Sequence, residues 1–278
     1  MRKNFAQALR SGGVEPEAEY SRLYALFYEP SIRYNKRLVS IHAFVDEYFT
    51  TFRFRGTCIL LKEFERKHGF VFEEQPQDFD IELLVRLAEY IYNMVQELQR
   101  VVNETNPFND LAINYGFVFE QIMRVIELVG YMQAEEDGFV IFVEKSHAAV
   151  AVAEILPAPS SYKVIAYNHY SMRGDLEAKR SALLSFVDLL EPQRKTLENI
   201  DRQFASDLFY AFNNFNVRHN NIDPSGAKYK KPIGDLSEEQ LEHWYDEIYQ
   251  MSLLAFLRLE HGKRKKEFDS LKSQIEGK

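Results

Sequence analysis

The chain has 278 residues, of which 46% are apolar, 14% aromatic and 27% charged, and its formal net charge is −8. This apolar content excludes an intrinsically disordered chain and allows one large domain or two small ones. The acidic balance argues against a protein that coats nucleic acid unspecifically. The single cysteine, Cys58, excludes an internal disulfide framework and a cysteine-rich zinc module. Because no apolar run could cross a membrane and residues 1–12 lack a signal-peptide stretch, we expect a folded cytoplasmic protein that does not bind membranes.

The first half of the sequence has the apolar spacing of amphipathic helices. Apolar residues recur there at steps of three and four, which places them on one helix face. The proline after Asn106 also marks a helix start, since proline fits the first helical turn. We therefore expect a helical region over residues 1–134. Its three apolar stripes are Leu38, Ile41, Val45, Tyr48 and Phe52; Leu84, Leu87, Ile91, Met94, Leu98 and Val101; and Val118, Ile122, Val125, Val129 and Met132.

The middle of the chain breaks this helical period. Residues 135–138 read Glu-Glu-Asp-Gly, which is a turn signal, and residues 139–143 are a short β-rich run. Residues 148–156 fit a second strand or a small helix, because valine favours the first and alanine the second. Residues 157–161 contain two prolines and indicate a linker. The sequence therefore predicts a small β-containing insert over residues 135–160.

The remaining residues, 161–278, return to a helical pattern. Their best-marked helix follows Ser237 and Gln240, which have the spacing of a capping box, with Leu236 and Leu241 placed as a hydrophobic staple. Its mixed-charge end beyond residue 263 predicts an exposed or frayed helical tail. The expected fold class is thus mainly α, a helical bundle with a small β hairpin. The sequence leaves open whether the parts pack as one body or two.

An asparagine-rich segment at residues 212–224 stands out from this pattern. Asparagine competes for backbone hydrogen bonds and is poor inside helices, so a helix should end here. One interpretation is a helix cap followed by an Asx-type turn, with Arg218 bound to a neighbouring helix. The other is a functional polar cluster, in which Arg218 binds phosphate through its planar guanidinium and His219 moves a proton near neutral pH. Both interpretations stay open.

The local charge makes the functional interpretation worth testing. Residues 216–232 hold Arg218, Lys228, Lys230 and Lys231 against one acidic residue, a net charge of +3. The net charge of −8 lies wholly in residues 1–216, because residues 217–278 hold eleven basic and eleven acidic residues. Tyr229, between two of the lysines, adds a ring on which a base could stack. An ordinary solvated loop explains the same lysines, and in isolation it is the simpler interpretation.

Residues 209–259 resemble the helical HEPN superfamily, in particular the bacterial abortive-infection factors of antiviral defence. The resemblance lies in a helix that ends in Asn-x-Arg-His-Asn-Asn, a polar loop, and a capped helix rich in aromatic residues. Residues 137–143 are similar to the β element that such proteins can carry upstream. The resemblance implies a HEPN-like region over residues 161–278 and a metal-independent ribonuclease whose cleft forms between two protomers. It also implies that Arg218 contacts phosphate and that His219 occupies the polar position behind it.

The spacing of this segment departs from the family pattern. Family members have a histidine after four to six residues beyond the arginine, but residues 223–225 are Asp, Pro and Ser. Either His219 serves the chemistry in an altered geometry, or the domain has lost catalysis and binds RNA or a partner. Arg37 and His42 do have the family spacing. Because His42 flanks an apolar helix face, we interpret it as a residue at the edge of the core.

The leading hypothesis is an RNA-directed defence or toxin-type factor that cleaves by attack of the RNA 2′-hydroxyl on its own phosphate. Arg218 would steady the charge of the phosphorane and His219 would act as acid or base. No cofactor or metal is expected, since the sequence has no glycine-rich phosphate loop, no Gly-x-Gly-x-x-Gly and no His-Glu-x-x-His. The residues expected to contact substrate are Asn214, Asn220, Asn221, Lys228, Lys230 and Lys231.

The second hypothesis is a non-catalytic helical interaction or sensor protein of a defence system. The 22 phenylalanines and 16 tyrosines exceed what a monomer core obviously needs, and aromatic residues often anchor interfaces. A ring-rich core explains the same numbers. The partners considered are RNA, a second copy of the chain in the HEPN case, and another protein. An ordinary metabolic enzyme has no recognisable motif in its favour.

Overall fold

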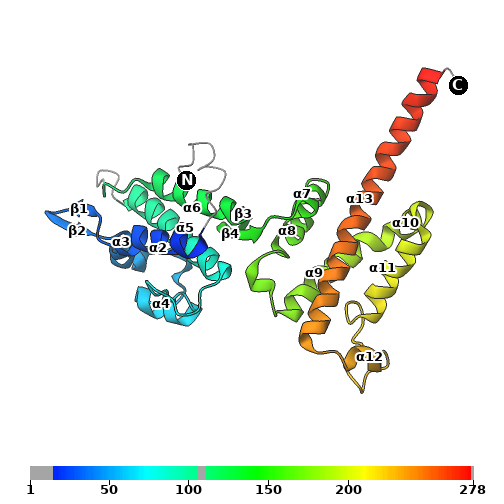
Figure 1. Ribbon diagram of the computed structural model, residues 1–278, viewed down its shortest axis with the longest axis horizontal. Helices are drawn as coiled ribbons and strands as arrows, with labels where there is room; N and C mark the ends of the chain where they lie inside the picture. The colour runs from blue at the N-terminus through cyan, green and yellow to red at the C-terminus, as the bar shows by residue number, and fades with distance from the viewer. Residues whose placement is uncertain (1–14, 106–110, 277–278) are drawn as a thin grey trace, which may run out of the picture. The chain divides into compact units, whose positions relative to one another are not determined.

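The computed structural model describes residues 15–105 and 111–276 (Figure 1). The helix start expected at Asn106 and the residues considered for a signal peptide lie outside these ranges. The chain forms two compact units, Met1–Phe142 and Val143–Lys278. Their boundary falls inside a strand of the expected insert. The mainly α fold class with a small β hairpin is confirmed.

The N-terminal unit is built from helices and two small sheets. Its elements in chain order are α2 (Pro16–Tyr28), β1 (Ile32–Tyr34), β2 (Arg37–Val39), α3 (Ile41–Tyr48), the 3-10 helices η1 (Phe49–Thr51) and η2 (Arg53–Arg55), α4 (Leu61–His68), α5 (Ile81–Thr105), α6 (Tyr115–Leu128), β3 (Tyr131–Glu136) and β4 (Phe139–Glu144). The long helix α5 packs against α2, α3 and α6. The apolar residues predicted for it, including Leu84, Ile91 and Leu98, are fully buried. Burial of this stripe holds the helices of the unit together.

A short hairpin precedes α3, where the sequence predicts a helix to begin. β1 and β2 pair antiparallel, with Ile32 opposite Val39, and Leu38 lies in β2 with an exposed side chain. The two residues between the strands, Asn35 and Lys36, have positive φ angles, as a tight two-residue hairpin turn requires. The helix starts only at Ile41, because the hydroxyl of Ser40 caps it by accepting from Ala43 N. Local turn and cap chemistry thus outweighs the apolar spacing of Leu38.

The second hairpin, β3–β4, confirms the predicted turn and strand. Asp137 and Gly138 have φ angles of 50° and 84°, which suit a two-residue hairpin turn. Met132 lies in β3 and not in the preceding helix, since α6 ends at Leu128 and Gly130 follows with φ 85°. Side chains of α5 bind the free edge of β4. Asn93 donates to Val140 O at 2.7 Å and accepts from Val140 N at 2.9 Å.

The C-terminal unit is helical. Its elements are α7 (His147–Ala153), α8 (Ala158–Ala166), η3 (Tyr170–Met172), α9 (Leu176–Leu190), η4 (Glu191–Gln193), α10 (Arg194–Ile200), α11 (Arg202–Asn214), α12 (Lys231–Gly234) and α13 (Glu238–Glu276). α13 packs against α7, α9, α10 and α11 (Figure 1). Its start confirms the capping box, because Ser237 N donates to Gln240 Oε1 and Gln240 N donates to Ser237 Oγ. α13 is therefore the central helix of this unit.

Two segments that the sequence left open or assigned to a linker are helical. Residues 148–156, which fitted either a strand or a helix, contribute to α7. The linker expected at residues 157–161 is instead the start of α8, whose N-cap is Pro157. Proline is compatible with a helix start because its missing N–H has no helical partner there. None of the described helices combines the length and apolar character that a membrane crossing requires.

Candidate functional site

The asparagine-rich segment forms a loop held by two buried asparagines. Asn216 adopts the left-handed backbone region with φ 59°, which asparagine tolerates better than most residues. Its backbone N–H donates to Asn221 Oδ1 at 2.9 Å, and the Asn221 N–H donates to Asn216 Oδ1 at 3.1 Å. Asn221 also donates to Lys228 O and accepts from Lys230 N, both at 2.8 Å. This reciprocal pair closes the loop after α11.

The same loop is tied to two helices of the unit. Asn216 Nδ2 donates to the hydroxyl of Tyr245 in α13 at 3.0 Å. Arg180 in α9 donates from Nε to Asn216 O at 2.7 Å and to Val217 O at 3.2 Å. These bonds satisfy backbone groups that would otherwise be buried without partners. In this arrangement Asn216 and Asn221 are structural residues.

The two predicted catalytic residues, Arg218 and His219, have different surroundings. Arg218 forms an ion pair with Glu191 of η4 at 3.1 Å, and its backbone N–H donates to Phe212 O. The guanidinium is thus bound to a neighbouring element, as the cap interpretation expects. His219 is half-buried and has no hydrogen-bond partner among the described residues. A phosphate at Arg218 would have to compete with the Glu191 carboxylate.

The residues predicted to contact substrate divide into two groups. The amide of Asn214 donates to Tyr210 O within α11, and Asn220 accepts from Asp223 N in the loop. Asn221 is buried in the loop core. By contrast, the side chains of Lys228, Lys230 and Lys231 are all exposed. The structure brings Asn221 together with the backbones of Lys228 and Lys230 and leaves the three ammonium groups open to solvent.

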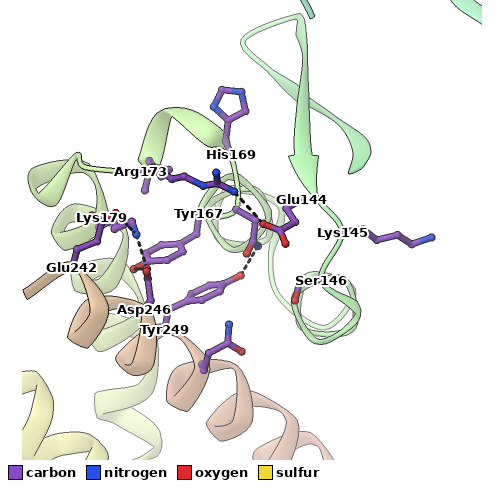
Figure 2. Close-up of a pocket in the computed structure, with 13 residues that line it drawn as sticks. Glu144, Lys145, Ser146, Tyr167, His169, Arg173, Lys179, Glu242, Asp246 and Tyr249 are labelled. Atoms are coloured by element: carbon purple, nitrogen blue, oxygen red, sulfur yellow. Dashed lines mark hydrogen bonds and ion pairs between the residues drawn. The ribbon is translucent and has the colours of Figure 1, made fainter. Parts of the chain in front are cut away.

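A polar cavity that the sequence did not predict lies elsewhere in the C-terminal unit. Its volume is about 510 Å³. It is enclosed by the end of β4, the segment from α8 through η3, and helices α9 and α13 (Figure 2). The lining residues that form its contacts are Glu144, Tyr167, Arg173, Lys179, Glu242, Asp246 and Tyr249.

One side of this cavity is an ion cluster centred on Lys179. The lysine is only 4% exposed, and its Nζ lies 2.7 Å from Glu242 Oε1 and 2.6 Å from Asp246 Oδ1. Gly174 N also donates to Glu242 Oε1, and the hydroxyl of Tyr167 donates to Asp246 Oδ1. One cation and two carboxylates give the cluster a net charge of −1. Since Oε1 and Oδ1 serve these bonds, the second oxygen of each carboxylate can accept from a ligand.

Two stacked tyrosines form the floor beside the cluster. The rings of Tyr167 and Tyr249 lie 4.0 Å apart at 10° (Figure 2). The Tyr249 hydroxyl donates to Val164 O and accepts from Asn168 Nδ2. Burial raises the pKa of both phenols, for Tyr167 with a further contribution from the nearby Asp246 carboxylate. Both rings therefore stay neutral, and the Lys179 ammonium lies over the Tyr167 ring, 5.5 Å from its centre.

The opposite side carries a second, looser ion pair. Arg173 lies 3.5 Å from Glu144, and both side chains are about half exposed. Lys145 points away from the cavity in Figure 2.

Burial alone would raise the pKa of Glu242, but the hydrogen bonds from Lys179 and Gly174 lower it overall. The cavity therefore has an anionic side at Glu242 and Asp246 and an exposed guanidinium at Arg173.

Comparison with known proteins assigns no family to this site. No family model matches the chain, and neither a curated protein nor a solved structure matches it. Within the described ranges, no three histidine, cysteine or carboxylate side chains are grouped as metal ligands would be.

One spacing pattern in the sequence indicates residues of the cavity, although the sequence analysis did not use it. Glu242, Asp246 and Tyr249 are spaced at i, i+4 and i+7, so they lie on one face of α13. This face carries two carboxylates beside the buried stripe of a central helix. Tyr167 caps the C-terminal end of α8 and Lys179 lies in α9, and no spacing rule connects them to α13.

Proposed function

We propose that the C-terminal unit is a binding module for a small zwitterionic molecule, so that the protein acts as a sensor. It shares with the second hypothesis from the sequence only the non-catalytic sensor role. The observation that carries it is the cluster in which the buried Lys179 binds two partly exposed carboxylates, Glu242 and Asp246, with a net charge of −1, beside a pair of stacked tyrosines. The two carboxylates outnumber the one ammonium that they bind, so their second oxygens can accept from a further cation. An ammonium group of a ligand supplies that cation.

The two sides of the cavity select different parts of such a ligand. The second oxygens of Glu242 and Asp246 accept from an ammonium group. The guanidinium of Arg173 binds a carboxylate in exchange for Glu144, from which it is 3.5 Å away. We place this activity in the cytoplasm, where the single buried thiol of Cys58 stays reduced.

Calorimetric titration of the full chain tests the proposal with three matched probes. We expect γ-aminobutyrate, which carries both charges, to bind more tightly than propylamine, which carries only the cation, and propionate to bind least. This order follows from the anionic cluster, because the ammonium contributes a charge-assisted hydrogen bond. Tightest binding by propionate, or no binding by any probe, would contradict the proposal.

Two variants assign the contacts. Asp246→Asn removes the negative charge and keeps an oxygen for Tyr167, so we expect binding of γ-aminobutyrate to weaken by about 10-fold to 100-fold. Glu247→Gln makes the same charge change at an exposed neighbour and is the control. Arg173→Gln is expected to weaken γ-aminobutyrate but not propylamine. Equal effects of Asp246→Asn and Glu247→Gln on binding would show that the ligand does not contact the cluster.

RNA binding at the asparagine loop is the second candidate function. The observation in its favour is that the Asn216–Asn221 pair fixes a loop on which Lys228, Lys230 and Lys231 are all exposed. Exposed cations on a loop whose backbone is held in place suit a phosphate backbone. This proposal includes the defence role suggested by the resemblance. Arg218 can then catalyse only after its ion pair with Glu191 breaks.

The salt dependence of binding to a uridine oligonucleotide tests this second candidate. Replacing Lys228, Lys230 and Lys231 with glutamine should weaken binding and reduce the slope of log K against log salt by about 0.7 per lost phosphate contact. The control replaces Lys62, Lys67 and Lys195, three exposed lysines elsewhere in the chain, with glutamine. Cleavage in EDTA that is lost in Arg218→Ala would support the ribonuclease. Identical binding by the two triple variants would exclude the loop as the RNA site.

A further inference from the structure

The outward face of α13 carries a heptad pattern that its own unit covers only in part, because Leu257 packs against the core and Gln250 lines the polar cavity. Eight positions follow one another at alternating steps of four and three residues, the a and d positions of a coiled coil. Four of the eight are aromatic or aliphatic residues that are exposed, at 42% for Leu254, 64% for Phe268, 54% for Leu271 and 78% for Ile275. In chain order the positions are Gln250, Leu254, Leu257, His261, Arg264, Phe268, Leu271 and Ile275.

Apart from the partly buried Leu257, this face lies away from the core of the C-terminal unit. The residues of α13 that pack into that core, such as Ser252, Ala255 and Leu259, belong to the other side of the helix. A second helix could therefore run along the a and d positions from Gln250 to Ile275 without displacing the core.

The end of α13 has no support from the core. Leu259 is the last residue of the helix in the buried cluster, yet the helix continues to Glu276 (Figure 1). An isolated helix of this length is marginal in water, and Gly262 weakens it further. The exposed residues of this end include three apolar ones, Phe268, Leu271 and Ile275. A partner helix on these residues would stabilise the end.

The charged residues beside the a and d positions, which form the seam of a coiled coil, are complementary to those of a second copy of the chain. The e positions, which follow each d position, are Met251, Arg258, Lys265 and Lys272, and the last three are basic. The g positions, which precede each a position, include Glu260 and Glu267. When two copies lie parallel and in register, each g residue faces the e residue five positions later in the partner. Glu260 then faces the partner's Lys265, and Glu267 faces the partner's Lys272.

An antiparallel pair would bring like charges together. In that orientation e positions face e positions and g positions face g positions, so lysine meets lysine and glutamate meets glutamate. We propose that residues 250–275 of two copies form a parallel, in-register, two-stranded coiled coil. The polar seam residues Gln250, His261 and Arg264 lower the stability of the pair, and polar seam positions help to fix the register.

Sedimentation of the full chain over a range of concentrations tests the dimer. We expect a monomer–dimer equilibrium, with Leu271→Asp raising the dissociation constant by at least about 100-fold, because both copies lose a buried leucine. Ser273→Asp adds the same charge at a position outside the seam of the same helix and is the control, with little effect. A strict monomer, or a dimer unchanged by Leu271→Asp, would overturn the proposal.

A charge reversal tests the orientation separately. Lys272→Glu places glutamate against the partner's Glu267 twice in the parallel dimer, so we expect about tenfold weaker association. In an antiparallel dimer the introduced glutamate would instead face the partner's Lys265 and strengthen association, which would overturn the parallel arrangement. Adding Glu267→Lys to Lys272→Glu restores opposite charges in the parallel dimer and should recover the original affinity. Circular dichroism of each variant reports whether α13 stays helical.

Discussion

At the scale of single residues, asparagine performs in the 216–221 loop what few other residues can. Asn216 combines a left-handed backbone with a side chain that accepts from Asn221 N and donates to Tyr245. Asn221 returns the same kind of bond to Asn216 N. The segment that looked catalytic from its composition is thus also explained by the hydrogen bonds of a buried turn, the first of the two interpretations from the sequence.

The loop pair gives a prediction about stability. Asn221→Ala leaves the backbone N–H of Asn216 and the carbonyl of Lys228 without their partners, so we expect the free energy of unfolding to fall by about 1–3 kcal/mol. Urea unfolding followed by Trp244 fluorescence measures it. Asn220→Ala, at the exposed neighbour, is the control and should cost less. Equal costs for the two variants would show that the reciprocal pair does not hold the loop.

At the scale of elements, one carboxylate joins η2 to α5 in the N-terminal unit. Glu97 is 3% exposed and accepts from Arg53 N at 2.8 Å and from the Arg53 guanidinium at 2.9 Å. Arg100, one turn later in α5, donates to the same carboxylate at 2.7 Å. Burial by itself would raise the pKa of Glu97, but the hydrogen bonds from Arg100 and Arg53 outweigh it and lower the pKa to about 2.

This lowered pKa predicts loss of stability in acid. A carboxyl whose pKa is depressed by folding stabilises the protein fully above its unfolded value, near 4.5, and loses that contribution as the pH falls toward about 2. We therefore expect the stability difference between the native chain and Glu97→Gln to be largest at neutral pH and to shrink progressively below about pH 4.5. Urea titrations at several pH values measure it. A difference that stays constant across this range would contradict the prediction.

A matched variant distinguishes the buried Glu97 carboxylate from the carboxylate of an ordinary surface ion pair. Glu120 forms an i, i+4 pair with Arg124, and both side chains are exposed. Surface pairs of this kind contribute between about 0 and 1 kcal/mol. Glu120→Gln should therefore change the stability little at any pH.

At the scale of the whole molecule, each unit buries its own core. The buried cluster that contains Phe186, Phe212 and Tyr249 consists wholly of residues of the C-terminal unit. The single cysteine and the single tryptophan of the chain fall in different units, Cys58 in the first and Trp244 in the second. Labelling of the buried Cys58 thiol and fluorescence of Trp244 therefore report on the two cores separately.

We expect a change in the second core to move one of these signals and not the other. Lys179→Met leaves Glu242 and Asp246 without their cation and should lower the unfolding free energy seen by Trp244 by about 1–3 kcal/mol. Protection of Cys58 from labelling should keep its original urea dependence, because its neighbours belong to the other core. Lys195→Met, at an exposed lysine, is the control. A parallel shift of both signals would show that the units unfold as one.

The sequence by itself determined the elements whose signals are local. The apolar stripe of α5, the capping box at Ser237 and the hairpin turn at Asp137 each depend on residues within a few positions of one another. Errors arose where two local rules competed. At Leu38 the turn and the Ser40 cap outweighed helical spacing, and at Pro157 a proline that indicated a linker instead begins α8.

Only the tertiary structure decided which polar residues meet. Tyr167 caps α8, Lys179 lies in α9 and Asp246 in α13, and their bonds of 2.6 Å and 3.0 Å exist because these three helices pack around one core. Arg218 likewise finds Glu191 through the packing of η4 and not through sequence spacing. Hydrogen bonds and ion pairs act over a few ångströms. Residues far apart in the chain therefore acquire them only once burial of the apolar stripes has fixed the helices in place.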